Sequence, residues 1–175
     1  MGSDKLSLVS DTGGLLERVC RSAALCCDLV VVAGPERSDI ALPVTFVLED
    51  PPWGGPVAGI SAAVEALPAD THEVLLLAGD LANPERVIEL LASEPLDHDA
   101  VLPVDSGGWP QYLAGLYRAP ALRTRIAALP DSRDLSVRRL FSDLDSRVID
   151  SSDDDLADVD TPEDAQRWNF RHAAT

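Results

Sequence analysis

Val74-Leu-Leu-Leu-Ala78, followed directly by Gly79-Asp80, gives the clearest indication of the fold. The apolar run is short and continuous and ends at turn-forming residues, a pattern typical of a strand buried on both faces. Such strands build parallel sheets that helices cover on both sides. In these sheets ligands bind beyond the carboxyl ends of the strands, so Asp80 lies where a binding site is expected.

Similar apolar runs alternate with Ala/Leu-rich segments of helical period along the rest of the chain. Strands are also predicted at residues 29–33, 44–48, 100–104, 112–117 and 147–150, the first of them fully buried. Helices are predicted at residues 14–27, 56–67, 84–92, 119–129 and 135–144, and a terminal helix opens at Thr161. The alternation predicts an α/β fold with a mostly parallel sheet, a Rossmann-like three-layer sandwich. No repeat or low-complexity linker divides residues 1–175, so a single domain is predicted.

Composition limits the classes of function. The chain has 175 residues, of which 46% are hydrophobic, enough for one domain with an apolar core. Its formal charge of −16 argues against a nucleic-acid polymer as partner, because phosphate backbones require a basic surface. No apolar run approaches the roughly 20 residues that span a membrane, and no signal-peptide pattern opens the chain. An odd count of three cysteines without metal-ligand spacing predicts reduced thiols, and the protein is expected in the cytoplasm.

Lys5 is the only lysine in the sequence, against 13 arginines. A flexible ammonium is not interchangeable with a planar guanidinium where a single point charge must reach a phosphate. We therefore consider Lys5 a candidate phosphate contact. The alternative is a lysine retained by chance near a chain end.

Carboxylates also follow the second predicted strand, at Glu49-Asp50. Parallel strands would place Ala33-Gly34, Glu49-Asp50 and Gly79-Asp80 at one edge of the sheet. Two carboxylates at one edge suggest a metal or sugar-hydroxyl site, although either can simply cap a turn.

Four motifs occur in an order that resembles a known family. They are Met1-Gly2-Ser3-Asp4-Lys5, Glu49-Asp50 with Gly55-Pro56-Val57-Ala58-Gly59, Leu77-Ala78-Gly79-Asp80, and Asp158-Val159-Asp160-Thr161-Pro162-Glu163-Asp164. In this order they resemble the molybdenum cofactor guanylyltransferases, which belong to the wider nucleotidyltransferases of the nucleotide-diphospho-sugar transferase type. The likeness runs from residue 1 to about Trp168.

The resemblance implies a role for each matching residue. Lys5 would contact the nucleotide phosphates, Asp50 the nucleotide, and Asp80 a magnesium ion. Asp160 would complete the metal site, although it can also be a structural neighbour of a helix cap at Thr161.

Two loop segments stay open between a binding role and a structural role. The segment Gly55-Pro56-Val57-Ala58-Gly59 either launches a helix or brings backbone amides close to the base or ribose. The segment Trp109-Pro110-Gln111 falls where the family places its second-substrate loop, although an aromatic residue beside a proline is more often a packing residue.

The implied reaction is transfer of GMP from GTP to a phosphorylated pterin, molybdopterin, with Mg²⁺ as cofactor. Nucleotidyl transfer attacks an α-phosphate and expels pyrophosphate, so negative charge must be offset at both groups. Carboxylate-bound Mg²⁺ and a lysine supply that positive charge, and no Ser or Cys nucleophile is needed. The alternatives are a transferase that uses CTP or a different phosphorylated acceptor, and an inactive relative that binds a nucleotide or a maturation partner. Transient contact with cofactor-maturation proteins is a further expectation.

Two departures from the family pattern bear on activity. The family begins with an apolar strand and a glycine-rich loop that do not precede Met1 here, and we expect an in-frame extension upstream to encode them. Without that strand, a gap with unpaired backbone groups is expected between the strands at Leu29 and Val74. The family also often has an asparagine where this chain has Ala33.

Overall fold

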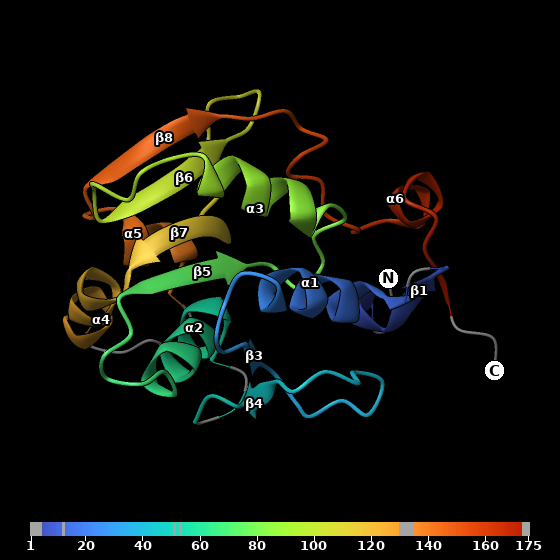
Figure 1. The fold of residues 1–175 in the computed structure, drawn as a ribbon, viewed down its shortest axis with the longest axis horizontal. Helices are drawn as coiled ribbons and strands as arrows, with labels where there is room; N and C mark the ends of the chain where they lie inside the picture. Colours follow the sequence, from blue (N-terminus) through green and yellow to red (C-terminus); the bar gives the residue numbers. More distant parts are fainter. Residues whose placement is uncertain (1–4, 12, 51, 53, 130–134, 173–175) are drawn as a thin grey trace.

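The computed structural model describes residues 5–11, 13–50, 52, 54–129 and 135–172 (Figure 1). In chain order its elements are η1 Lys5–Ser7, β1 Leu8–Ser10, β2 Gly13–Gly14, α1 Leu15–Ala24, β3 Val31–Ala33, β4 Thr45–Val47, α2 Pro56–Glu65, β5 Glu73–Leu77, α3 Pro84–Ala92, β6 Ala100–Val104, β7 Ala114–Arg118, α4 Ala119–Ala127, α5 Val137–Phe141, β8 Ser146–Asp150, α6 Pro162–Arg167 and β9 Arg171–His172. The motif residues 1–4 lie outside the described residues.

The main sheet has four strands in the order β5-β7-β6-β8. β6 pairs with β8 in parallel, whereas β7 runs antiparallel to both β5 and β6. Strands β5, β6 and β8 therefore share one direction, and β7 is reversed. The connection from β6 to β7 contains no helix, which is possible because antiparallel neighbours need no crossover.

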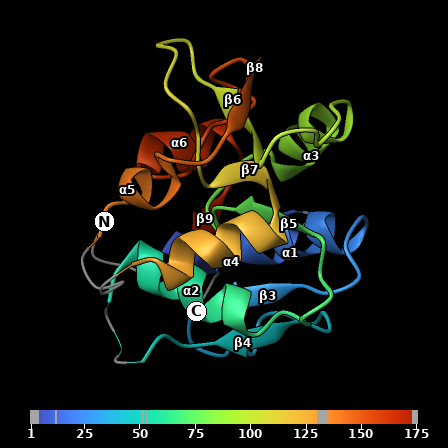
Figure 2. The same cartoon turned by 90° about the vertical axis from the view of Figure 1, so that its left-hand side faces the viewer.

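Helices cover both faces of this sheet (Figures 1 and 2). On one face, α2, α4 and α5 pack against β6 and β7 through Val57, Ile60, Val64, Ala100, Leu102, Tyr117, Leu122, Leu140 and Phe141. On the other face, α1 and α3 pack through Val19, Leu81, Val87, Leu91, Val101 and Ala114. The adjacent residues Val101 and Leu102 thus enter opposite cores, as the alternation of side chains along a strand requires. The predicted three-layer α/β sandwich is confirmed.

Strands β3 and β4 form a separate parallel pair, which Figure 1 shows apart from β5. Within the described residues no strand joins β3 to β5, so the expected gap between them is present. The sequence predicts full burial of β3, and this prediction is wrong. Val31 and Val32 are half-buried and Ala33 is exposed. Among the described residues β3 has a strand neighbour on one side only, and it lacks the cover that a central strand receives.

Three short strands that the sequence pattern does not predict lie near the chain ends. β1 pairs with β2 and with β9, antiparallel in both cases. Leu8 of β1 is 2% exposed and belongs to a small core with Leu15, Ala82, Val159, Ala165 and Phe170. This core holds the segment that carries Lys5 beside the turn after β5 and beside the segment that leads into α6.

Candidate active site

Asp80 reaches the carboxyl end of β5 through a turn that favours glycine. Ala78 donates its amide to the Leu113 carbonyl at 2.6 Å, and Gly79 follows. A Cβ atom on Gly79 would lie 3.1 Å from Cδ1 of Leu16, so a side chain there would press against α1. The Asp80 side chain is 18% exposed. It lies beyond the strand end, where the sequence predicts a site.

The segment before α6 runs beside this turn. Leu81 and Asp158 form an isolated antiparallel bridge, and the Val159 amide donates to the Asp80 carbonyl at 2.9 Å. Val159 is fully buried. Its neighbours Asp158 and Asp160 project to the other side of the extended segment, where both line a pocket together with Asp80.

Thr161 caps α6, as the sequence predicts. Its hydroxyl accepts the Asp164 amide at 3.1 Å, and the Asp164 carboxylate accepts the Thr161 amide at 2.9 Å. This capping box uses the side chains of Thr161 and Asp164. The Asp160 carboxylate is left for other partners, so the helix cap and a site role for Asp160 are compatible.

Lys5 lies between two of these carboxylates. Its Nζ donates to Oδ1 of Asp160 at 2.5 Å and forms an ion pair with Asp80. Partial burial lowers the pKa of the Lys5 ammonium, but the hydrogen bonds and charges of Asp160 and Asp80 outweigh this effect and hold the pKa above its usual value. The lysine of this chain is therefore a lasting positive charge at the centre of the site.

Asp158 adds a third carboxylate that sequence patterns do not single out. Burial, followed by repulsion from Asp80 and Asp160, raises the pKa of Asp158 to about 6, and the Lys5 charge offsets only part of this rise. Part of the residue remains exposed to solvent. The rise depends on burial in the fold and on Asp80, which is distant in the chain, so the sequence alone does not reveal it.

Asp158→Asn is expected to raise the melting temperature in metal-free buffer at about pH 8. The folded-state pKa of about 6 lies above the ordinary value of 3.8, so the ionised carboxylate destabilises the fold above that pKa. The gain should shrink as the pH falls through this pKa and vanish at about pH 4. Melting curves followed by circular dichroism in EDTA measure it. A gain of equal size at both ends of this range would assign the effect to packing and contradict the charge argument.

Lys5 and the three carboxylates line one pocket of ≈ 440 Å³. Its walls come from Lys5, Ala78, Asp80, Leu81, Pro110, Gln111, Tyr112, Leu113, Ala114, Val137, Leu156, Asp158 and Asp160. The structure thus brings together Lys5, Asp80 and Asp160 of the predicted site residues. Asp50 is exposed after β4 and does not line this pocket. The expected common edge is divided because β3 and β4 stand apart from β5.

The structure bears differently on the two loop segments, 55–59 and 109–111, for which the sequence allows either a binding or a structural role. Gly55 has a φ of 84°, and Pro56 is the first residue of α2, so the segment does launch a helix. Its contact with a nucleotide stays a prediction. Trp109 is 61% exposed, which does not fit a packing role, and Cζ of Arg138 lies 5.6 Å from the centre of its ring. The adjacent Pro110 lines the pocket.

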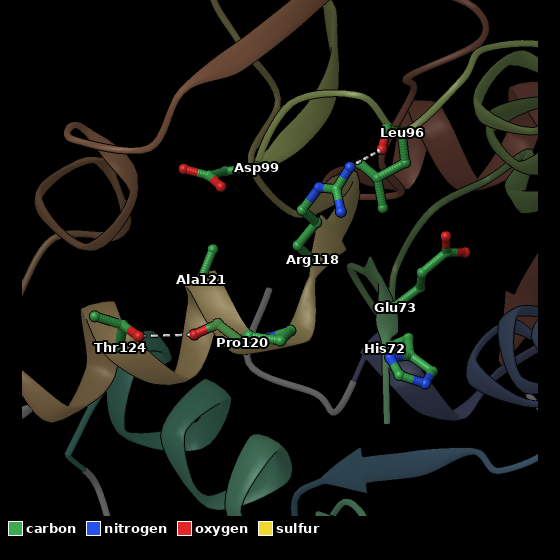
Figure 3. Close-up of a pocket in the computed structure, with 8 residues that line it drawn as sticks. All are labelled: His72, Glu73, Leu96, Asp99, Arg118, Pro120, Ala121 and Thr124. Carbon is green, nitrogen blue, oxygen red and sulfur yellow. Dashed lines mark hydrogen bonds between the residues drawn. The ribbon is translucent and has the colours of Figure 1, made fainter. Parts of the chain in front are cut away.

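A second pocket of ≈ 420 Å³ lies at the opposite end of β5 (Figure 3). It is lined by His72, Glu73, Leu96, Asp99, Arg118, Pro120, Ala121 and Thr124. Arg118 donates to the Leu96 carbonyl at 2.6 Å and to the His98 carbonyl at 2.8 Å. Its guanidinium therefore has a structural role, since it connects the end of β7 to the loop before β6. Figure 3 shows the carboxylates of Glu73 and Asp99 turned away from each other. The pocket that contains Lys5 is therefore the better candidate site.

The described part of the chain also limits other kinds of site. None of its helices is long and apolar enough to cross a membrane. It contains no group of three or more His, Cys, Asp and Glu side chains arranged to enclose a metal ion. A divalent cation in the pocket would therefore rely on one or two carboxylates together with ligand and water oxygens. Mg²⁺ is usually bound in this way in sites that handle phosphates, so the donor set fits it.

The fold and the site together define a class of protein. An α/β sandwich with a lysine and carboxylates beyond the carboxyl end of a strand is suited to binding a nucleotide and to transfer chemistry at its phosphates. Residues 1–148 match the family described as the MobA-like NTP transferase domain. The chain belongs to this family of nucleotidyltransferases.

Individual relatives agree with this assignment. A Synechococcus elongatus protein named probable molybdenum cofactor guanylyltransferase is 35% identical over 141 residues, and the match covers 73% of this chain and 69% of the relative. A Nostoc sp. protein of the same name is 34% identical over 132 residues, with 70% and 61% covered. Molybdopterin-guanine dinucleotide biosynthesis protein A from Archaeoglobus fulgidus superposes with a TM-score of 0.67 at 18% identity, over 96% of this chain and 90% of that one. An Anaerococcus prevotii 4-diphosphocytidyl-2C-methyl-D-erythritol synthase gives 0.66 at 12% identity, with 94% and 91% covered. The last two comparisons show the shared fold.

Proposed function

We propose that this nucleotidyltransferase is a molybdenum cofactor guanylyltransferase, which transfers GMP from GTP to molybdopterin, a phosphorylated pterin. The observation that carries the proposal is the convergence of Asp80 and Asp160 on Lys5, in a chain whose curated relatives bear that name. In this reaction an oxygen of the acceptor phosphate bonds to the α-phosphorus of GTP. The bond between the α-phosphorus and the oxygen that it shares with the β-phosphate breaks, and pyrophosphate leaves.

Asp80 and Asp160 are the residues that would hold Mg²⁺, because both carboxylates reach the position of one ammonium group. When bound, a divalent cation supplies positive charge to the α-phosphate and to the leaving pyrophosphate. Lys5 has a flexible side chain, so it can exchange these carboxylates for the oxygens of the triphosphate. The chain thus offers two carboxylates and one mobile cation for a reaction that depends on positioning and electrostatics.

On the acceptor side, the exposed Trp109 indole offers a flat face to a pterin ring, and the Arg138 guanidinium can pair with its phosphate. The Asp105 carboxylate accepts the amides of Gly107 and Trp109, each at 2.9 Å. These bonds fix the loop that presents the indole. Because the neighbouring residues Pro110 and Val137 line the pocket, Trp109 and Arg138 stand at its border.

GTP with Mg²⁺ is expected to raise the melting temperature more than CTP or ATP with Mg²⁺ at equal concentration. A ligand that binds only the folded state stabilises it by about 2.7 kcal/mol at a concentration of 100 Kd, and the better-bound nucleotide reaches this level first. Thermal unfolding with each nucleotide measures the difference. Equal shifts from all three nucleotides would remove the guanine assignment, and a larger shift with CTP would favour a cytidylyltransferase.

An inactive nucleotide-binding relative is the second candidate. It is favoured by the position of Ala33, an exposed side chain at the end of β3 on a pair of strands that stands apart from β5. This candidate predicts a thermal shift with nucleotide and Mg²⁺ but no release of pyrophosphate when a phosphorylated pterin is added.

A further inference from the structure

Two adjacent cysteines lie just beyond the end of α1. The amides of Cys26 and Cys27 donate to the Ala23 carbonyl at 3.1 and 2.9 Å, so the last turn of the helix fixes their backbone. This turn places both thiols on one side, with their Sγ atoms 3.8 Å apart. Cys26 is exposed and Cys27 is half-buried. A small reagent can therefore reach the pair from solvent.

Cys27 holds its proton at neutral pH. Burial, followed by the charge and hydrogen bond of Cys26 and the charge of Asp28, raises the pKa of Cys27 to about 11. A thiol with a raised pKa is a poor nucleophile, because the thiolate is the reactive form. The chemistry that fits such a pair is a ligand that takes both sulfurs together and removes both protons.

The two sulfurs lie close enough to bind one atom. Their Sγ atoms are 3.8 Å apart, close to van der Waals contact, so rotation of the side chains can bring both sulfurs onto a single centre. Within the described ranges, no set of three or more His, Cys, Asp and Glu side chains is arranged to enclose a metal ion. A metal that needs four protein ligands is poorly served here. A trivalent arsenic that carries one organic substituent needs only two sulfurs.

We propose that Cys26 and Cys27 form a dithiol site for trivalent arsenicals. With an arsenoxide, R–As=O, the two S–H bonds break, two As–S bonds form, and the oxygen leaves with both protons as water. Arsenic and sulfur keep their oxidation states, so the step needs no oxidant or reductant. The second As–S bond forms within the molecule, which strengthens binding over that of a single thiol. The site is formed by residues outside the pocket that contains Lys5 and does not rest on the proposed transferase activity.

Phenylarsine oxide and the full-length protein provide the test. Intact-mass spectrometry should show one adduct per chain, heavier by the reagent minus one water, and the adduct should block alkylation of Cys26 and Cys27 together. Cys26→Ser and Cys27→Ser should each weaken binding by about 100-fold or more, measured in competition with a monothiol. Cys20→Ser is the matched control, because Cys20 is buried within α1 at 3% exposure, and it should bind like the parent.

Two results would overturn the proposal. One is alkylation of Cys26 and Cys27 independently of each other in the presence of the arsenical. The other is a Cys26→Ser variant that resists the competing monothiol as well as the parent protein. Cys26 is exposed, so its serine variant is expected to keep the parent melting temperature. Should Cys27→Ser fail to fold, Cys26→Ser alone decides the question.

Discussion

Replacing Asp80 with asparagine is expected to lower the turnover number kcat for GMP transfer by a factor on the order of 10² or more. The substitution keeps the shape of the side chain and removes the charge that pairs with Lys5 and would hold a divalent cation. The melting temperature should change little, because the lost ion pair is balanced by relief of the repulsion that acts on Asp158. The initial rate of pyrophosphate release measures the effect.

Asp97→Asn is the matched control for this experiment. Asp97 pairs with Arg147 at 2.6 Å ahead of β6, at the end of the sheet away from the pocket, so its replacement should leave turnover unchanged. If Asp80→Asn instead unfolds most of the protein while the folded remainder transfers GMP at the normal rate, Asp80 is a turn residue. The site assignment would then be wrong.

Phe141→Ala is expected to reduce the free energy of unfolding by about 3–5 kcal/mol. Phe141 is 2% exposed, and its ring centroid lies 5.4 Å from that of Tyr112 and 4.8 Å from that of Tyr117. Removing the ring leaves a cavity between α5 and the main sheet and withdraws support from Tyr112, which lines the pocket. Urea denaturation followed by circular dichroism measures the loss.

Leu25→Ala provides the control for the Phe141 substitution, because Leu25 is 85% exposed and its truncation opens no cavity. It should change the free energy of unfolding by no more than about 0.5 kcal/mol. A loss below about 1 kcal/mol for Phe141→Ala would mean that the helices close over the gap, and the ring cluster would not be a main source of stability.

The parts of the fold with strong local signals could be predicted from the sequence. β6 and α3 have the predicted bounds, because a buried apolar run and a proline at the first helical position are both local features. β1, β2 and β9 have only two or three residues each, too few to show a period, and they exist because they pair with one another. The partial exposure of β3 likewise depends on its neighbours and not on its own apolar residues.

The candidate site likewise contains residues that local sequence signals predict and features that depend on the folded structure. The strand-end rule located Asp80, and the rarity of lysine drew attention to Lys5, and the structure places both in one pocket. The raised pKa of Asp158 could not be predicted, because it comes first from burial in the fold and then from repulsion that includes Asp80, a residue distant in the chain. Asp50 was expected at the same edge on the assumption of one continuous sheet, and the separate β3–β4 pair breaks that assumption.

The decisive assay follows label from GTP labelled at the α-phosphate to a phosphorylated pterin, with Mg²⁺ present. We expect a labelled pterin–GMP product, with one pyrophosphate released for each product formed, and a loss of both in the Asp80→Asn protein. Absence of a labelled product with GTP, CTP and ATP alike, from a protein that is folded, would contradict the proposed transferase activity.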